Sequence, residues 1–125
     1  LAADRERIER WRSRLEAGAG LSIGLSWRGG TRKTRADLRS MNVQDFLPLA
    51  AFKQHRYFCL QRGDCREEIA GARAAGLEMQ WWPEALDDIE ESAALIAALD
   101  LVISVDNTVV HLAGALGGDK PTYTL

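Results

Sequence analysis

The chain of 125 residues has room for one compact domain and not for two. Its hydrophobic fraction of 46% and charged fraction of 27% are typical of a soluble globular domain, and a net charge of −2 without a basic face argues against nucleic acid or an anionic membrane as the main partner. No apolar run approaches the ~20 residues of a membrane helix, and the N-terminus has no signal-peptide pattern.

The predicted helices and strands alternate along the chain. A charged surface helix opens it, over residues 4–15 of a leading segment 1–18, with Asp4 as its cap and with Ile8, Trp11 and Leu15 at helical spacing. Strands are predicted over residues 21–27, 56–60, 77–82 and 101–105, and from Pro121 onward, with helices over residues 42–52, 65–75, 89–99 and 109–116. This alternation predicts an α/β fold in which right-handed crossovers build a parallel sheet with helices on both faces.

The two cysteines, Cys59 and Cys65, are too few for a disulfide framework and lack the CxxC spacing of a zinc site. We therefore expect reduced thiols in a cytoplasmic protein, with Cys59 in the core. The chain begins with Leu1 and ends at Leu125 inside a predicted strand, so we expect residues 1–125 to be a single domain of a longer polypeptide.

Ligands of parallel sheets bind outside the carboxyl ends of the strands, which directs attention to the segment after the fourth strand. Asp106, Asn107 and Thr108 lead directly into the predicted helix, and His111 lies one turn after Asn107 on the same helix face. The unpaired amides and the dipole of a helix start favour phosphate. A plain helix cap at Asp106 or Asn107, with an ordinary half-buried His111, is the alternative interpretation.

The segment after the first strand is rich in glycine and cations. Trp27 is followed by the glycines Gly29 and Gly30, which let a backbone approach a ligand, and by five cations that suit phosphate oxygens: Arg28, Arg32, Lys33, Arg35 and Arg39. The alternative is a solvated basic loop. Neither a P-loop nor a GxGxxG motif is present, which disfavours ATP and NAD.

Weaker signals come from the other strand ends. Gln61 could contact a base or ribose, although a loop glutamine is more often solvated, and Ser92 could approach a ribose. The carboxylates at positions 87, 88, 90 and 91 are better explained as partners of a helix dipole than as metal ligands. The pair Trp81-Trp82 is better explained by packing than by stacking on a base.

Taken in order, these motifs resemble the carboxyl-terminal domain of bacterial tetratricopeptide-repeat glycosyltransferases, which are related to heptosyltransferases and to O-GlcNAc transferase. The resemblance covers nearly the whole chain and includes Trp11. Asn107 stands where the family more often has Thr, and Gly118-Asp119 lengthens the turn before Lys120. The matching stretches are residues 23–40, Leu60-Gln61, residues 88–96 (DIEESAALI), residues 99–106 (LDLVISVD) and residues 111–122 (HLAGALGGDKPT).

The resemblance implies a Rossmann-like domain that forms the carboxyl-terminal half of a GT-B fold and binds a nucleoside diphosphate sugar, without metal or other cofactor. It implies a protein or glycan acceptor, an amino-terminal domain and tetratricopeptide repeats in the same polypeptide, and no catalytic base that we can name here. Arg28, Lys33 and Arg39 would stabilise the departing diphosphate. The donor site would comprise Trp27, Arg28, Gly29, Gln61, Ser92, Asp106, Asn107, Thr108 and His111.

Two other functions remain open from the sequence. One is a non-catalytic module that senses a nucleotide or binds a partner. The other is an epimerase-like domain acting on nucleotide sugars, for which His111 and the carboxylates near Asp88 are the available proton-transfer groups.

Overall fold

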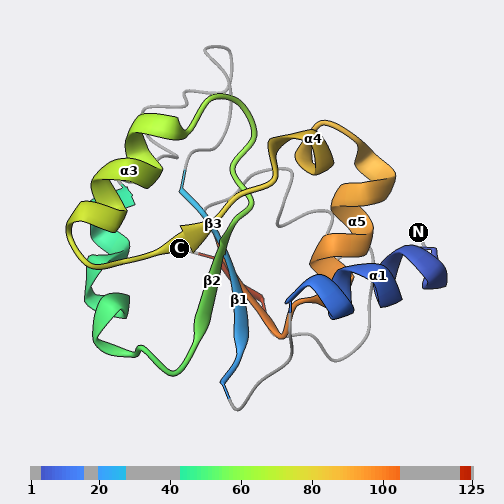
Figure 1. Ribbon diagram of the computed structural model, residues 1–125, viewed down its shortest axis with the longest axis horizontal. Helices are drawn as coiled ribbons and strands as arrows, with labels where there is room; N and C mark the ends of the chain where they lie inside the picture. Colours follow the sequence, from blue (N-terminus) through green and yellow to red (C-terminus); the bar gives the residue numbers. More distant parts are fainter. Residues whose placement is uncertain (1–3, 16–19, 28–42, 105–121, 125) are drawn as a thin grey trace.

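A computed structural model describes residues 4–15, 20–27, 43–104 and 122–124 (Figure 1). Helices and strands alternate through these residues in nearly the predicted order. In chain order they are α1 (Arg5–Leu15), β1 (Ser22–Ser26), the 3-10 helix η2 (Val43–Ala51), β2 (Arg56–Cys59), α3 (Arg66–Ala74), β3 (Met79–Gln80), α4 (Pro83–Leu86), α5 (Ile89–Ala98), β4 (Leu101–Ser104) and β5 (Thr122–Thr124).

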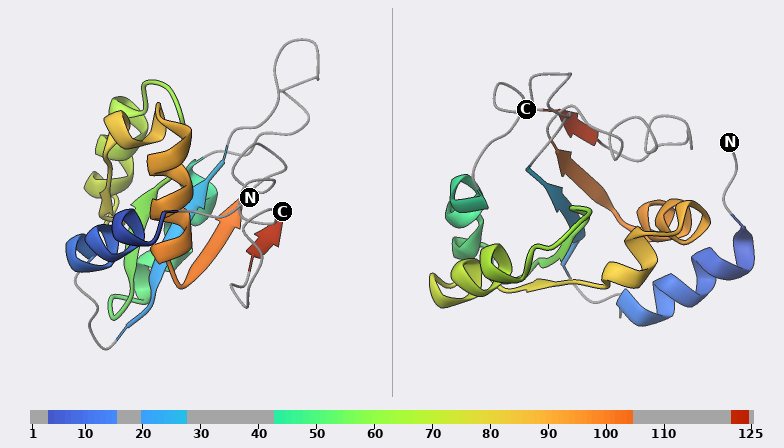
Figure 2. Two further views of the ribbon diagram at one scale, coloured as in Figure 1. Left: turned by 90° about the vertical axis from the view of Figure 1, so that its right-hand side faces the viewer. Right: turned by 90° about the horizontal axis from the view of Figure 1, so that it is seen from above.

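The described strands form one parallel sheet in the order β3-β2-β1-β4-β5. The helices η2 and α3 cover one face of this sheet, and α1, α4 and α5 cover the other (Figure 2). This strand order, with β1 at the centre and the chain turning back across it to β4, is that of Rossmann-like folds. The predicted α/β fold with a parallel sheet and helices on both faces is therefore confirmed.

Strand β1 separates two hydrophobic cores. Ile23 and Leu25 pack on the side of η2 and α3, whereas Gly24 faces the side chains of Leu60 and Leu99 on the side of α5. The alternation follows from the pleat of a strand, which sends successive side chains to opposite faces. All five residues of β1 are buried, as expected for a parallel strand with a helix layer on each side.

The leading helix α1 is part of the core on the α5 side. Asp4 caps it, because its Oδ1 accepts a hydrogen bond from the Glu6 amide at 2.9 Å. Trp11 is buried, and its indole Nε1 donates to Glu91 of α5 at 2.9 Å. Arg7 donates to the same carboxylate at 2.5 Å. A helix that the sequence places on the surface is thus held to the domain by one buried face and a shared carboxylate.

Three elements differ from the sequence prediction. The predicted helix over residues 42–52 is a 3-10 helix, in keeping with Pro48, which lacks an N–H group and obstructs the α-helical ladder. The predicted third strand over residues 77–82 pairs only at Met79 and Gln80. Pro83 does not simply end that strand, since it is the first residue of the short helix α4, a position that proline favours.

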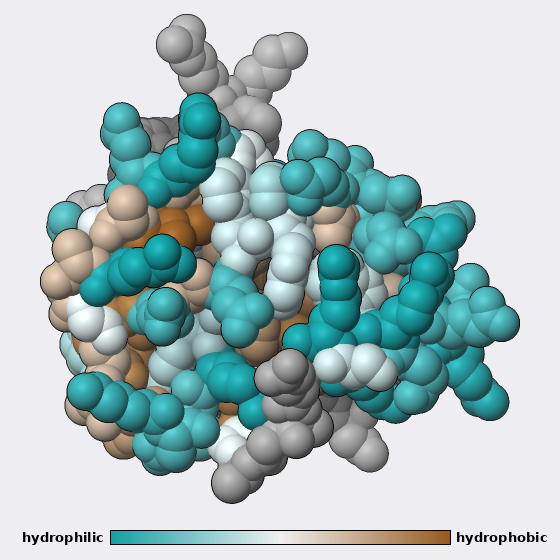
Figure 3. Space-filling model, in the orientation of Figure 1, coloured by the Kyte–Doolittle hydropathy of each residue, from teal (hydrophilic) through white to brown (hydrophobic). Residues whose placement is uncertain are grey.

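Hydrophilic side chains dominate the part of the surface formed by α1 and α5 in the view of Figure 3. The charged residues of α1 contribute to this surface, since only Trp11 and Leu15 of that helix are buried. Within the described parts of the chain, none of the helices is both long and apolar enough to span a bilayer.

A Gly24→Ala substitution is expected to lower the free energy of unfolding by about 1–3 kcal/mol, as overpacking of a core typically does. A Cβ atom at this position would lie 2.4 Å from Cδ1 of Leu60 and 2.7 Å from Cδ1 of Leu99. Urea unfolding followed by circular dichroism measures the change.

Gly71→Ala is the matched control for this prediction. Gly71 lies in α3, and a Cβ there would meet nothing within 4 Å. Because alanine is the better helix former, this variant should be more stable by roughly 0.5–1 kcal/mol. Equal effects of the two substitutions would contradict the close packing around Gly24.

Candidate functional site

The candidate site lies where β1 and β4 run side by side and end at the same edge of the sheet. Their paired residues run from Ile23 with Leu101 to Ser26 with Ser104. From β1 the chain continues outward through β2 to β3, and from β4 it continues in the other direction to β5. In an open parallel sheet, the carboxyl edge at such a change of direction is where ligands bind.

Most of the predicted donor residues lie just beyond these two strand ends in the sequence. Residues 28–42 follow β1, and residues 105–121 follow β4. The sequence candidates that fall outside the described residues are Arg28, Gly29, Lys33, Arg39, Asp106, Asn107, Thr108 and His111. The structure therefore tests the strand ends that precede these residues and the three candidates that it describes, namely Trp27, Gln61 and Ser92.

The ends of β1 and β4 are polar although they are fully buried. Ser26 and Ser104 are paired in register, and both side chains have no exposed surface. Polar groups in such a place need hydrogen-bond partners, since burying an unpaired polar group is costly. Each of these two serines has interactions within the described structure.

Gln61 supplies partners for the end of β1. Its side-chain Oε1 accepts from the Ser26 hydroxyl and from the Trp27 amide, both at 3.1 Å. The side chain is 9% exposed, so it is not the solvated loop glutamine that residue type alone favours. Gln61 thereby holds the backbone at the point where the chain leaves β1 toward residues 28–42. The sequence analysis predicted Gln61 as a site residue but did not predict its hydrogen bonds to Ser26 and Trp27.

Trp27 contacts Gln61 through its backbone, while its side chain belongs to the core. The side chain is 0% exposed, packs edge-on against Phe46, and donates from Nε1 to the carboxylate of Glu68 on α3. The indole therefore has no surface on which a base could stack. Any contact of Trp27 with a ligand in this conformation would have to come from its main chain.

Ser92 is in the first turn of α5, and its hydroxyl donates to the carbonyl of Ala85 at 3.0 Å. Asp88 caps the same helix by accepting from the amides of Glu90 and Glu91 at 2.8 and 3.3 Å. These contacts support the interpretation of the carboxylates at positions 87, 88, 90 and 91 as partners of a helix start.

Among the described residues, no three His, Cys, Asp or Glu side chains are grouped as metal ligands would be.

Both cysteines lie beneath the loop that carries Gln61. The Sγ atoms of Cys59 and Cys65 are 3.9 and 3.5 Å from the carbonyl oxygen of Gln61, and both residues are buried and reduced. A hydrogen bond with the Cys65 thiol, together with burial, raises the pKa of Cys59 far above its usual range. Its burial confirms the prediction that Cys59 lies in the core, and a buried thiol that keeps its proton is unreactive at neutral pH.

Replacing Gln61 with methionine is expected to lower the free energy of unfolding by about 1–3 kcal/mol, because two hydrogen bonds to buried groups are lost. Gln80→Met, at an exposed position of β3, should change it by no more than about 0.5 kcal/mol. A double-mutant cycle with Ser26→Ala isolates the hydrogen bond of the serine hydroxyl. A zero coupling energy in this cycle would argue against the observed contact.

Cys59 should resist alkylation by iodoacetamide in the native protein and react readily in urea, because only the thiolate attacks the reagent. Its raised folded pKa means that the native state keeps the proton at pH values where the unfolded thiol, of pKa about 8.5, loses it. Stability should consequently fall as the pH rises above that value. Mass spectrometry of the labelled peptides measures the extent of alkylation. Rapid alkylation of Cys59 in the native protein would refute the prediction.

The chain is similar in sequence to a known bacterial protein. Protein FlbA of Caulobacter vibrioides is 37% identical to it over 128 residues, an alignment that covers 94% of this chain and 20% of FlbA. The chain thus spans about a fifth of the length of that relative. No protein-family model matches the sequence. No solved structure matches it significantly.

Proposed function

We propose that this chain is the donor-binding domain of a glycosyltransferase, which holds a nucleoside diphosphate sugar while the sugar passes to a protein or glycan acceptor. The pairing of β1 with β4 carries the proposal. It brings together the two strand ends after which the sequence has its cation-rich and Asp-Asn-Thr segments. A parallel sheet of this strand order binds nucleotides at that edge.

The chemistry of the two segments is complementary. The segment after β4 offers Asp106, Asn107 and Thr108 at a predicted helix start, where amides and the helix dipole attract a diphosphate. The segment after β1 offers Arg28, Lys33 and Arg39, whose charges would stabilise the diphosphate as it leaves the sugar. Gln61 contributes indirectly, by fixing the backbone from which the cationic segment departs.

The catalytic base and the acceptor site are assigned to another domain of a longer polypeptide. In the GT-B architecture that the resemblance implies, the donor and the acceptor bind to different domains. Within the described residues, the end of β1 is held by the hydrogen bonds of Gln61. We identify no pair of a nucleophile and a base among these residues. We therefore expect this chain by itself to bind nucleotide and to transfer little or no sugar.

Isothermal titration with UDP, GDP, ADP and CMP tests the proposal directly. One or more of them should bind with a dissociation constant in the millimolar range or tighter. Arg39→Ala combined with His111→Ala should weaken that binding at least about tenfold, the loss expected when charge-assisted hydrogen bonds to phosphate are removed. Circular dichroism would show that the variant remains folded.

Arg10→Ala is the control, since Arg10 is an exposed cation on α1. It should leave nucleotide affinity unchanged apart from a small non-specific effect. Absence of binding by all four nucleotides, or equal binding by the parent and the double variant, would contradict the proposed donor site. Nucleotide binding without sugar transfer by the full-length polypeptide would instead identify a non-catalytic module.

A further inference from the structure

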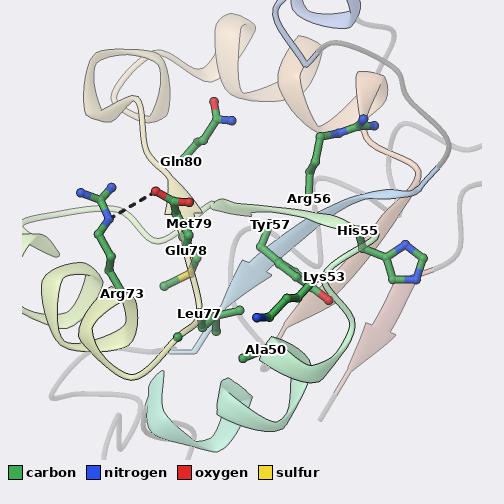
Figure 4. Close-up of a pocket in the computed structure, with 11 residues that line it drawn as sticks. Ala50, Lys53, His55, Arg56, Tyr57, Arg73, Leu77, Glu78, Met79 and Gln80 are labelled. Carbon is green, nitrogen blue, oxygen red and sulfur yellow. Dashed lines mark ion pairs between the residues drawn. The ribbon is translucent and has the colours of Figure 1, made fainter.

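A second concave surface lies at the opposite edge of the sheet from the candidate donor site. It is a groove of about 690 Å³ at the amino ends of β2 and β3, between the end of η2 and the turn from α3 to β3 (Figure 4). The lining residues that matter here are Lys53, Tyr57, Arg73, Gly76, Glu78 and Gln80. None of them belongs to the donor site proposed above.

Three cations line this groove; the guanidinium of Arg56 donates to the carbonyl of Gly20 and the hydroxyl of Ser22, and the other two lie on different sides of the groove. Lys53 extends over it from the side of η2, and Arg73 of α3 lies across from it beside Glu78 (Figure 4). Lys53 forms no ion pair with any residue that the structure describes. The pair between Arg73 and Glu78 is long, at 3.7 Å, and both side chains are more than half exposed, so solvent screens it and it contributes little to stability.

The groove also adjoins the outermost strand of the described sheet on this side. β3 is the last strand of the described sheet on this side and pairs only with β2, through Met79 and Gln80. Glu78 and Gln80 are exposed on either side of the buried Met79. An edge strand of this kind can accept a further strand from a peptide through main-chain hydrogen bonds, while flanking side chains select its sequence.

The wall of the groove on the η2 side is held in place by internal contacts. The hydroxyl of Tyr57 lies within hydrogen-bond distance of the carbonyls of Leu49 and Phe52, at 3.0 and 3.1 Å. His55 accepts from the Leu21 amide at 3.0 Å through Nδ1. The position from which Lys53 extends is therefore fixed before any ligand arrives, which lowers the ordering cost of binding.

We propose that this groove and the edge of β3 form a docking site for an extended acidic peptide segment. The peptide would pair with β3 through its main chain, and carboxylates along it would meet Lys53 and Arg73. Because these two cations lie on different sides of the groove, a peptide with several carboxylates can meet both. Glu78 opposes an acidic ligand and therefore limits its affinity.

Fluorescence anisotropy with a labelled peptide of alternating glutamate and valine tests this proposal on the full 125-residue chain. Binding is expected in the micromolar to millimolar range and should weaken with salt. Amide chemical shifts of Met79 and Gln80 should change on titration. A peptide of alternating lysine and valine should not bind, and replacing alternate valines with proline should abolish binding because proline lacks the donor that pairs with β3.

Substitutions of the charged residues in the groove are expected to change the affinity for the peptide in opposite directions. Lys53→Gln and Arg73→Gln should each weaken binding about three- to tenfold, whereas Glu78→Gln should strengthen it by removing an opposing charge. Arg66→Gln is the matched control, because Arg66 is an exposed arginine of α3 that pairs with Asp64 outside the groove. Nucleotide affinity should be the same in all four variants.

Three results would overturn the docking site. The first is no binding of the glutamate peptide. The second is an equal loss in Arg66→Gln and Arg73→Gln, which would show that attraction is only to net charge. The third is binding of succinate as tight as that of the peptide with the same amide shifts, which would identify a site for small anions.

Discussion

Strand β1 is the constraint on which the rest of this domain depends. It pairs with β2 on one side and β4 on the other, and helices cover both of its faces. Every backbone group of such a strand has to be paired inside the protein, since water does not reach it. Asp100 meets this requirement at the amino end, where its carboxylate accepts from the Ser22 amide at 2.8 Å, and Gln61 meets it at the carboxyl end.

This central strand also explains why the polar groups of the candidate site are where they are. A ligand site at the carboxyl edge requires polar atoms next to a core that is otherwise apolar, and each of them has to be satisfied before a ligand binds. Ser26 and Ser104 occupy that edge, and the Gln61 side chain joins the strand end to the loop above the buried cysteines. The described part of the candidate site is thus a hydrogen-bonded strand end, and the proposed ligand contacts belong to the segments that follow it.

The two edges of the sheet differ in chemistry. At the carboxyl edge, buried hydrogen bonds hold the strand ends, and the sequence places its glycine-rich and cationic segments immediately after them. At the amino edge, the described groove is open and its charged groups are mostly exposed. The hydrogen-bonded carboxyl edge fits the proposed nucleotide site, and the outermost strand of the described sheet fits the proposed peptide site.

The sequence alone determined the α/β fold, because the alternation of short apolar runs with amphipathic stretches allows few other arrangements. It also predicted β2 and α3 to within one residue at each end. Only the tertiary structure decided which strand ends are neighbours and what Gln61, Trp27 and Glu91 contact. Those partners are distant in the chain, with Trp27 bound to Glu68 and Trp11 to Glu91. Residue type and local spacing predict whether a segment is a strand or a helix, but hydrogen bonds between distant segments depend on the packing of the whole sheet, and no local pattern encodes them.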